Sequence, residues 1–285
     1  MWCIDMKLTY YCLAVSILFA LFNRNRAIVC LCIAITGLTS LYENVITLTG
    51  AVYLASLAIL AFLYFNYLID NTRLKHLVLI LLAILLAGFV LHDIPGFTNQ
   101  LIVDKYLISA ASRPCSIWLT FDKVFAALVI YALSPLIIKE SKIDWPASKQ
   151  TMLILFACIV VILGPAILSG YVRLDPKIPA ILPIWVVSNF LFVSFSEEVI
   201  FRGFLQTTLK DYLPSGLKYT LLAITIASII FGIAHYKGGI TFMCLAAIAG
   251  LFYGYAYDRT KRILCAMLVH FSLNLTHFLA FTYPC

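Results

Sequence analysis

Apolar runs of membrane-spanning length recur along the whole chain, separated by short clusters of charged residues. Two of them, 77–91 and 153–168, are almost continuously apolar. About 20 apolar residues in a helix cross the hydrocarbon core of a bilayer, where only helices and closed barrels satisfy their backbone hydrogen bonds. Barrel strands would alternate apolar and polar residues in segments of about ten, and these runs do not alternate. The sequence therefore predicts an all-α fold, a polytopic transmembrane helix bundle.

The composition excludes an ordinary soluble domain. Of the 285 residues, 63% are hydrophobic and 12% are charged, whereas a soluble domain is about 45–50% apolar and about one quarter charged. The net charge of +7 comes from small basic clusters between the apolar runs. We interpret these clusters as topology signals, so the expected partner is the lipid bilayer and not a nucleic acid.

We predict about 8–10 spans, with ten as the working number. Their approximate ranges are 8–22, 27–42, 45–69, 75–92, 121–138, 151–171, 180–206, 218–236, 240–257 and 263–282. Alternating the connections between two sides puts twelve lysines and arginines on one side and seven on the other. The richer side is predicted to be cytoplasmic, which places both termini outside. The short loops favour a prokaryotic plasma membrane, with the endoplasmic reticulum membrane as the alternative.

The polar residues inside apolar runs concentrate in the second half of the chain. We therefore predict N-terminal transmembrane helices over 1–145 and a C-terminal core over 146–285, separated by a linker at 139–149. The longest polar connection, 93–120, is interpreted as either a lid or a simple loop. The nine cysteines are odd in number and lack CxxC spacing, so we interpret them as small hydrophobic residues.

Two adjacent glutamates, Glu197 and Glu198, lie near the end of an apolar stretch that begins around Ile178. Each acidic residue at the centre of a membrane helix costs about 2.5–3.5 kcal/mol on insertion scales, so the pair predicts a functional site. Arg202 follows Glu198 at i+4, a spacing that allows an ion pair. Glu197 points about 100° away on a helix. We therefore predict that Glu197 is a general base and that Glu198 and Arg202 support it.

Two further apolar segments keep polar residues, FGIAH over 231–235 and HFSLN over 270–274. His270 and Asn274 are four residues apart and share one helix face, which His277 extends. Hydrolysis of an amide needs an activated water and donors aimed at the oxyanion. Glu197 and His235 are candidates for activating the water, and His270 and Asn274 are candidates for the donors.

Three classes of function remain open on these residues alone. The first is an integral-membrane protease. The second is a non-enzymatic membrane scaffold or bacteriocin-immunity protein, in which the histidines and Asn274 are only interhelical hydrogen-bonding groups. The third is a proton-coupled transporter that uses the buried carboxylates, although the chain lacks the repeats often found in such folds.

The segment from Glu197 to Gly203, Phe231 with His235, and His270 with Asn274 resemble the motifs EExxxR, FxxxH and HxxxN of the CPBP family. That family comprises CAAX-type prenyl-protein endopeptidases similar to the Ras-converting enzyme, and bacterial proteins of the Abi type. The resemblance covers about 180–282 and implies a CPBP-like catalytic core. It also implies a glutamic-type endopeptidase that hydrolyses a peptide bond near the C-terminus of a lipidated or membrane-anchored protein.

The resemblance also implies a role for each motif residue. Glu197 and His235 would activate water, and His270 and Asn274 would form the oxyanion hole. The residues that would support this geometry are Glu198, Arg202 and Phe231. A zinc ion held by Glu197, His235 and His270 is the alternative. Because HExxH is absent and one carboxylate is committed to an arginine, we expect no cofactor.

The predicted spans leave one conflict. They place Glu197 toward the cytoplasmic end of its helix and His235 near the opposite end of the next one. Catalysis requires both at one depth. We therefore expect either that 201–213 runs along the membrane surface or that one of these segments does not cross fully.

Overall fold

The computed structural model describes residues 6–23, 25–68, 72–135 and 145–283. Its contacts divide the chain into two compact units. The first unit is Met1–Ile102 with Trp118–Glu140, and the second unit is Val103–Ile117 with Ser141–Cys285. Seven helices of the described residues are long and apolar enough to cross a membrane. The predicted all-α polytopic helix bundle is confirmed.

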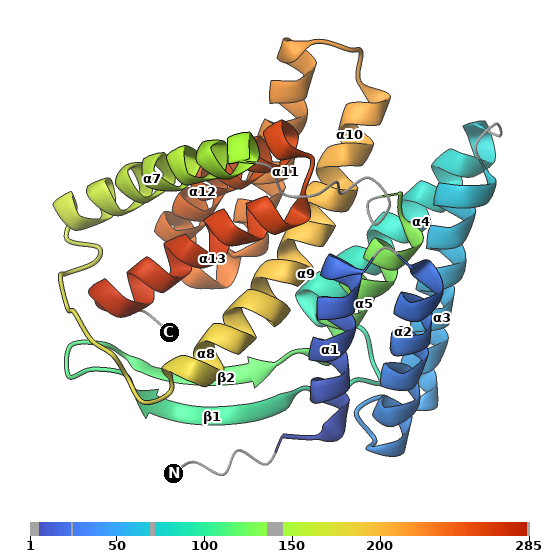
Figure 1. The fold of residues 1–285 in the computed structure, drawn as a ribbon, viewed down its shortest axis with the longest axis horizontal. Coiled ribbons are helices and arrows are strands. Elements are labelled where there is room, and N and C mark those ends of the chain that lie inside the picture. The colour runs from blue at the N-terminus through green and yellow to red at the C-terminus, as the bar shows by residue number, and fades with distance from the viewer. Residues whose placement is uncertain (1–5, 24, 69–71, 136–144, 284–285) are drawn as a thin grey trace. The chain divides into compact units, whose positions relative to one another are not determined.

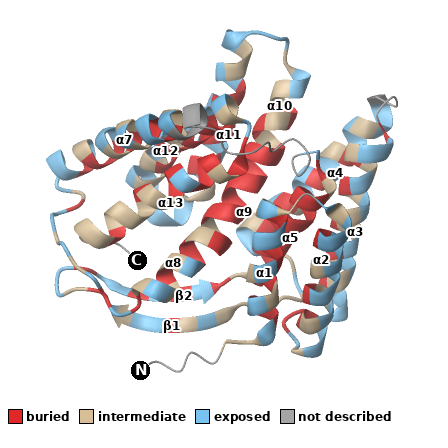
Figure 2. Cartoon of the chain, in the orientation of Figure 1, coloured by how far each residue is buried: buried red, intermediate tan, exposed pale blue. Residues whose placement is uncertain are grey.

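Five helices of the described residues belong to the first unit, and the fifth lies at its centre. They are α1 (Leu8–Phe22), α2 (Arg26–Tyr42), α3 (Leu48–Phe62) continued by the π-helical η1 (Leu63–Tyr67), α4 (Thr72–Leu91) and α5 (Phe121–Leu133). Helix α5 packs against each of α1 to α4, and Figure 2 shows it buried on nearly every side. The outer faces of α3 and α4 expose leucines and isoleucines, as lipid-facing helices do.

The helices match the predicted spans unevenly in the first unit. Helices α1 and α2 are apolar but have only 15 and 17 residues. At the predicted span 121–138 the structure has α5 with 13 residues, and 136–138 lie outside the described part of the chain. Since α5 is buried by four neighbours, its apolar character reflects packing within the unit.

The polar connection 93–120 contains two strands that were not predicted from the sequence. These are β1 (Gln100–Leu107) and β2 (Pro114–Leu119), which pair as a two-stranded sheet. Buried and exposed residues alternate along β2, which is the period of a half-buried strand. Cys115 on β2 is disulfide-bonded, so its interpretation as a small hydrophobic residue is wrong. The remaining cysteines that the structure describes are free.

The second unit is built on one helix of 31 residues, Leu182–Tyr212. It consists of α8 (Leu182–Val187), η2 (Ser188–Ser194), α9 (Phe195–Glu198), η3 (Val199–Gln206) and α10 (Thr207–Tyr212), where η2 and η3 are π-helical. Around it lie α7 (Trp145–Leu168), α11 (Leu217–Ala234), the 3₁₀ turn η4 (Tyr236–Gly238), α12 (Gly239–Thr260) and α13 (Ile263–Ala280). Helices α7, α12 and α13 lie side by side, and the long helix packs against α11, α12 and α13 (Figure 1).

The long helix removes the conflict over depth. Glu197 lies midway along it and not near its end, because the helix continues through the polar segment 207–212. Because Leu182–Tyr212 is one continuous helix, Glu197 and His235 share a level without 201–213 turning along the membrane surface, and the alternative that one segment does not cross fully stays a prediction. Helix α11 ends at Ala234, and the chain reverses through η4 and Gly239, whose φ is +83°. This reversal, which favours glycine, leaves His235 at the level of Glu197.

Part of the predicted linker 139–149 lies outside the described residues, namely 139–144. Helix α7 already begins at Trp145. The predicted division of the chain at 145/146 stays a prediction.

Candidate active site

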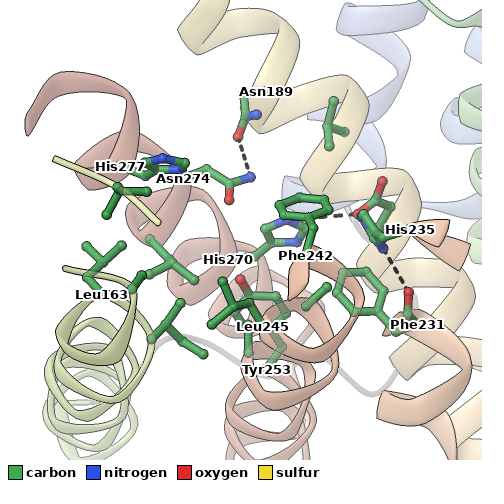
Figure 3. Close-up of a pocket in the computed structure, with 18 of the residues that line it drawn as sticks. Leu163, Asn189, Phe231, His235, Phe242, Leu245, Tyr253, His270, Asn274 and His277 are labelled. Carbon is green, nitrogen blue, oxygen red and sulfur yellow. Dashed lines mark hydrogen bonds and ion pairs between the residues drawn. The ribbon is translucent and has the colours of Figure 1, made fainter. Parts of the chain in front are cut away.

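The second unit encloses a cavity of about 320 Å³ among α7, the long helix, α11, α12 and α13 (Figure 3). Six of the residues singled out from the sequence line it. They are Glu197, Phe231, His235, His270, Asn274 and His277. Glu198 and Arg202 lie behind the wall and are fully buried. The structure thus brings side chains from three helices and one helix end to a single place.

The carboxylate of Glu197 faces two imidazoles from other helices. Its Oε2 lies 3.9 Å from Nε2 of His235 and 3.9 Å from Nε2 of His270. Both separations are too long for direct hydrogen bonds. Polar atoms at such distances are commonly bridged by a water molecule. The three groups therefore surround a position that a small polar molecule can occupy.

His235 is oriented by the end of its own helix. Its Nδ1 lies 2.8 Å from the carbonyl oxygen of Phe231. This carbonyl is free because the N–H of His235 bonds to Gly232 instead, as happens where helices end. Since a carbonyl only accepts, this contact assigns a hydrogen to Nδ1 of His235, and the neutral form of the ring has its lone pair on Nε2, which faces Glu197. The i, i+4 spacing of Phe231 and His235 in the FxxxH motif thus places the imidazole beside the carbonyl oxygen of Phe231 at the end of the helix.

The carboxylate of Glu198 contacts two side chains, the guanidinium of Arg202 and the imidazole of His270. Its Oε2 lies 3.2 Å from Nε of Arg202, the pair expected from the i+4 spacing, although without hydrogen-bond geometry. Its Oε1 accepts a hydrogen bond of 2.8 Å from Nδ1 of His270, a contact that the sequence did not predict. With Nδ1 donating to Glu198, His270 can donate from Nε2 only as an imidazolium. Glu198 therefore fixes the orientation of His270 as well as pairing with Arg202.

The buried guanidinium of Arg202 lies between aromatic rings. Its Cζ is 4.4 Å from the ring centre of Phe231 and 5.2 Å from that of Tyr253. Its Nη2 donates to the carbonyl of Gly250 at 3.2 Å. A Cβ at Gly250 would lie 3.1 Å from Nη2, so the glycine allows this approach. Cation–π contacts and the ion pair together offset the desolvation of the charge.

A similar contact, from a side chain of the long helix to a glycine carbonyl of α12, occurs one helical turn after Arg202. Gln206 donates through Nε2 to the carbonyl of Gly254 at 3.0 Å, and a Cβ at Gly254 would lie 2.6 Å from its Oε1. Gly250 and Gly254 form a GxxxG pattern, which brings membrane helices into close contact. This pattern is visible in the sequence but was missed there.

Two more polar residues of the cavity were missed from the sequence. Asn189 accepts a hydrogen bond of 3.3 Å from Nδ2 of Asn274. Tyr253 stacks on the imidazole of His270, with ring centres 4.6 Å apart and 11° between the planes. Asn189 is a polar residue within an apolar run, eight positions before Glu197, and that is the signal that points to it.

His277 lines the cavity but belongs to its far end. Its Nε2 lies 3.1 Å from the carbonyl oxygen of Thr282, and its ring lies 5.1 Å from that of Tyr283. The structure does not bring His277 to the group around Glu197.

Three segments outside the helices meet at Tyr283, a residue of the cavity wall. Asp175 accepts hydrogen bonds from Ser109 and Ser112 at the tip of the hairpin and from Lys177. The hydrogen bond from Ser109, followed by the contacts with Lys177 and Ser112, lowers the pKa of the Asp175 carboxyl below its usual range. The backbone N–H of Tyr283, a residue of the cavity wall, donates to Ser112. The tip of segment 93–120 thus contacts the wall of the cavity, and its interpretation as a lid stays a prediction.

An apolar groove lies next to the cavity, between α7 and α12. It encloses about 380 Å³ and is lined by Pro165, Ala166, Ser169, Tyr171, Ile240, Thr241, Cys244 and Leu245. Ala166, Tyr171 and Leu245 also line the cavity itself. The cavity and the mostly apolar groove therefore share part of one wall.

The part of the chain that the structure describes holds no group of three or more His, Cys, Asp or Glu side chains arranged to bind a metal ion. The set proposed for zinc, Glu197 with His235 and His270, does not meet that geometry. Zinc ligands lie about 2.0–2.2 Å from the ion through nitrogen or oxygen. The three side chains as they lie thus do not fit a zinc ion.

Residues 179–276 match a family model described as Rce1-like, type II CAAX prenyl endopeptidase Rce1-like. The matched segment contains all three motifs and every residue of the group around Glu197. Comparisons with curated proteins and with solved structures gave no match.

Proposed function

We propose, on the premise that the chain belongs to the Rce1-like CPBP family through residues 179–276, that it is an intramembrane endopeptidase. The family implies a protease of the CAAX type, and the seven apolar helices indicate a multi-pass membrane protein. The proposed reaction is hydrolysis of a peptide bond near the C-terminus of a lipidated or membrane-anchored protein. The observation that supports it most is the carboxylate of Glu197 between two imidazoles, 3.9 Å from each.

The proposed nucleophile is a water held between Glu197 and His235. With Nδ1 of His235 bonded to a carbonyl, its Nε2 accepts a hydrogen bond from that water. Glu197 takes the other proton as the oxygen attacks the carbonyl carbon of the substrate. The proton then passes to the leaving nitrogen as the C–N bond breaks.

Two donors are proposed for the tetrahedral oxygen, both on α13. Asn274 offers Nδ2, and His270 offers Nε2 as an imidazolium whose charge is balanced by Glu198. A donor of this kind typically contributes about 10²–10³ in rate. Burial of Glu198 and Arg202 keeps His270 in place while the reaction proceeds.

A lipid-linked substrate is supported by the apolar groove between α7 and α12. Because three residues line both the groove and the cavity, a hydrocarbon chain in the groove places an attached peptide beside Glu197. The short loops favour the plasma membrane of a prokaryote over the endoplasmic reticulum.

The test uses the purified protein in lipid vesicles with two peptides of one sequence, with and without a lipid thioether on a cysteine near the C-terminus. We expect cleavage of the lipidated peptide at least about tenfold faster, since burying even a few methylene groups contributes about 0.8 kcal/mol each. Mass spectrometry of the products measures both rates and locates the new C-terminus.

A variant that fills the groove makes the test specific. Cys244→Trp should remove the preference for the lipidated peptide, because the indole would fill the groove. Cys244 lines the groove but not the cavity. Cys30→Trp, at an exposed cysteine of α2, is the matched control. If neither peptide is cleaved, the proposed protease activity is rejected. If both peptides are cleaved at equal rates, the lipid-linked substrate is rejected.

A further inference from the structure

We infer that Asn189 is a positioning residue of the proposed oxyanion hole, which turns the amide of Asn274 so that its N–H faces the substrate. The inference rests on the proposed function, because it assigns Asn189 a role only through Asn274. No motif of the family resemblance includes Asn189.

The contact that carries the inference joins two helices across the cavity. Nδ2 of Asn274 on α13 donates to Oδ1 of Asn189 on η2 at 3.3 Å (Figure 3). Both side chains line the cavity, and Asn189 is only 8% exposed. His270 lies one helical turn before Asn274 on the same face. The pair is thus in direct contact with the space in which the substrate carbonyl is expected.

An asparagine can serve an oxyanion in only one of its two amide orientations. With Nδ2 toward the substrate it donates, whereas with Oδ1 toward the substrate it places a partial negative charge against the oxyanion. Nδ2 carries two hydrogens. When Asn189 accepts one of them, as it does in the structure, the other remains for the substrate. The reversed orientation of Asn274 keeps this contact only if the amide of Asn189 reverses as well, so the carbonyl oxygen that Asn189 presents favours the orientation that the reaction needs.

The local backbone supports a dedicated role for this residue. Asn189 belongs to the π-helical segment η2, which directly precedes the turn with Glu197. Such segments are rare and occur frequently at functional sites. This one brings Asn189, Val193 and Glu197 to the wall of one cavity. The base and the orienting amide are thus carried by the same helix.

A double-mutant cycle tests the inference on the full-length protein in vesicles. The variants are Asn189→Leu, Asn274→Leu and the double variant, and the readouts are kcat and KM for peptide cleavage. We expect Asn189→Leu alone to lower kcat by about tenfold to a hundredfold, less than the loss of a whole oxyanion donor. KM should change by less than about twofold, because the contact acts on the transition state.

In the Asn274→Leu background the same substitution should change kcat by less than about twofold, because the residue it orients is absent. Equal losses in both backgrounds contradict the inference, since a general packing role would act independently of Asn274. Full kcat in Asn189→Leu contradicts it as well. If wild-type protein shows no cleavage that depends on Glu197, the proposed function fails, and this outcome is distinct from the other two.

Two further variants are controls that separate a loss of kcat from a loss of folding. Asn189→Ser has a hydroxyl too short to reach Asn274 and should reproduce the pattern of Asn189→Leu with less change in packing. Asn66→Leu is the matched control, because Asn66 lies on η1 and donates to backbone carbonyls of the first unit. It should leave kcat unchanged. A thermal melt of each variant shows whether it is folded under the assay conditions.

Discussion

The two units each bury a carboxylate that contacts an imidazole, with almost the same geometry. In the first unit Nδ1 of His92 lies 2.7 Å from Oδ2 of Asp122. In the second unit Nδ1 of His270 lies 2.8 Å from Oε1 of Glu198. Both carboxylates are nearly inaccessible to solvent, so neither distance nor burial of the acid distinguishes the pairs.

The surroundings of the two imidazoles distinguish them. His92 follows the end of α4 with a φ of +61°, and 35% of its side chain is exposed. Asp122 lies in the first turn of α5, where a negative charge is favoured by the helix dipole. His270, by contrast, is 5% exposed and has Glu197 beside its second ring nitrogen. The first pair connects two helix ends, whereas the second belongs to the wall of a cavity.

The comparison shows that an acid–imidazole pair is not by itself a catalytic site. What the second unit adds is a further carboxylate, a further imidazole and space for a reacting molecule, at a depth where these groups are costly. Four experiments, three of them on pairs of variants and one with a chelator, test whether this difference matters.

The largest difference is expected between the two units' histidines. His235→Ala should lower kcat by about 10²–10⁴-fold, because the proposed water loses the group that holds it opposite Glu197. His92→Ala should change kcat by less than about twofold. Peptide cleavage in vesicles measures both, and a comparable loss in His92→Ala would contradict the comparison.

Removal of each buried carboxylate should separate the pairs by stability. Glu198→Gln leaves the guanidinium of Arg202 without its counter-charge, and breaking a buried pair in this way costs about 3–5 kcal/mol. Asp122→Asn should cost about 1–2 kcal/mol, since an amide still accepts from His92, which is partly solvated. Thermal unfolding in detergent compares them, and equal shifts of Tm would show that the surroundings do not matter.

A smaller effect is expected from adding a methyl group behind the second pair. Gly250→Ala places a Cβ 3.1 Å from Nη2 of Arg202 and should destabilise the protein by about 1–3 kcal/mol, as overpacking does. Gly164 on α7 has no atom within 4 Å of such a Cβ, so Gly164→Ala should leave Tm unchanged or slightly higher. A lower Tm in Gly164→Ala than in Gly250→Ala would reject this packing of Arg202.

The smallest effect is expected from removing metal ions. Because the group around Glu197 lacks the arrangement of a metal site, treatment with a zinc chelator should change kcat by less than about twofold. Loss of cleavage that added zinc restores would instead assign Glu197, His235 and His270 as ligands. The matched measurement is the thermal melt, which should be unaffected by the chelator.

The motif residues of the cavity were predictable because an ionisable or amide group is costly in an apolar run unless a partner or a function retains it. Spacing alone also predicted the pair of Glu198 with Arg202, which the structure contains. Hydropathy could not show that the helix continues through the polar segment 207–212, since transfer to lipid and helix continuity are different properties. Because the predicted span stopped at 206, before that segment, Glu197 was predicted to lie near the end of its helix.

Other features depend on tertiary contacts that no local pattern encodes. The contact of His270 with Glu198 joins residues 72 positions apart. The π-helical segment with Asn189 has no compositional signal. The two strands within 93–120 were not predicted, because this polar connection was interpreted as a lid or a loop. The alternation along β2 becomes informative only once the buried residues of that strand are known.

The most direct test of the proposed mechanism is cleavage of the lipidated peptide in H₂¹⁸O by wild-type protein and by Glu197→Gln. We predict that the wild-type product carries ¹⁸O in its new C-terminal carboxylate and that Glu197→Gln, folded and with an unchanged Tm, gives no product over the same time. Glu43→Gln, in a connection of the first unit, should behave as wild type. Undiminished, ¹⁸O-labelled cleavage by Glu197→Gln would contradict the claim that this carboxylate activates the water.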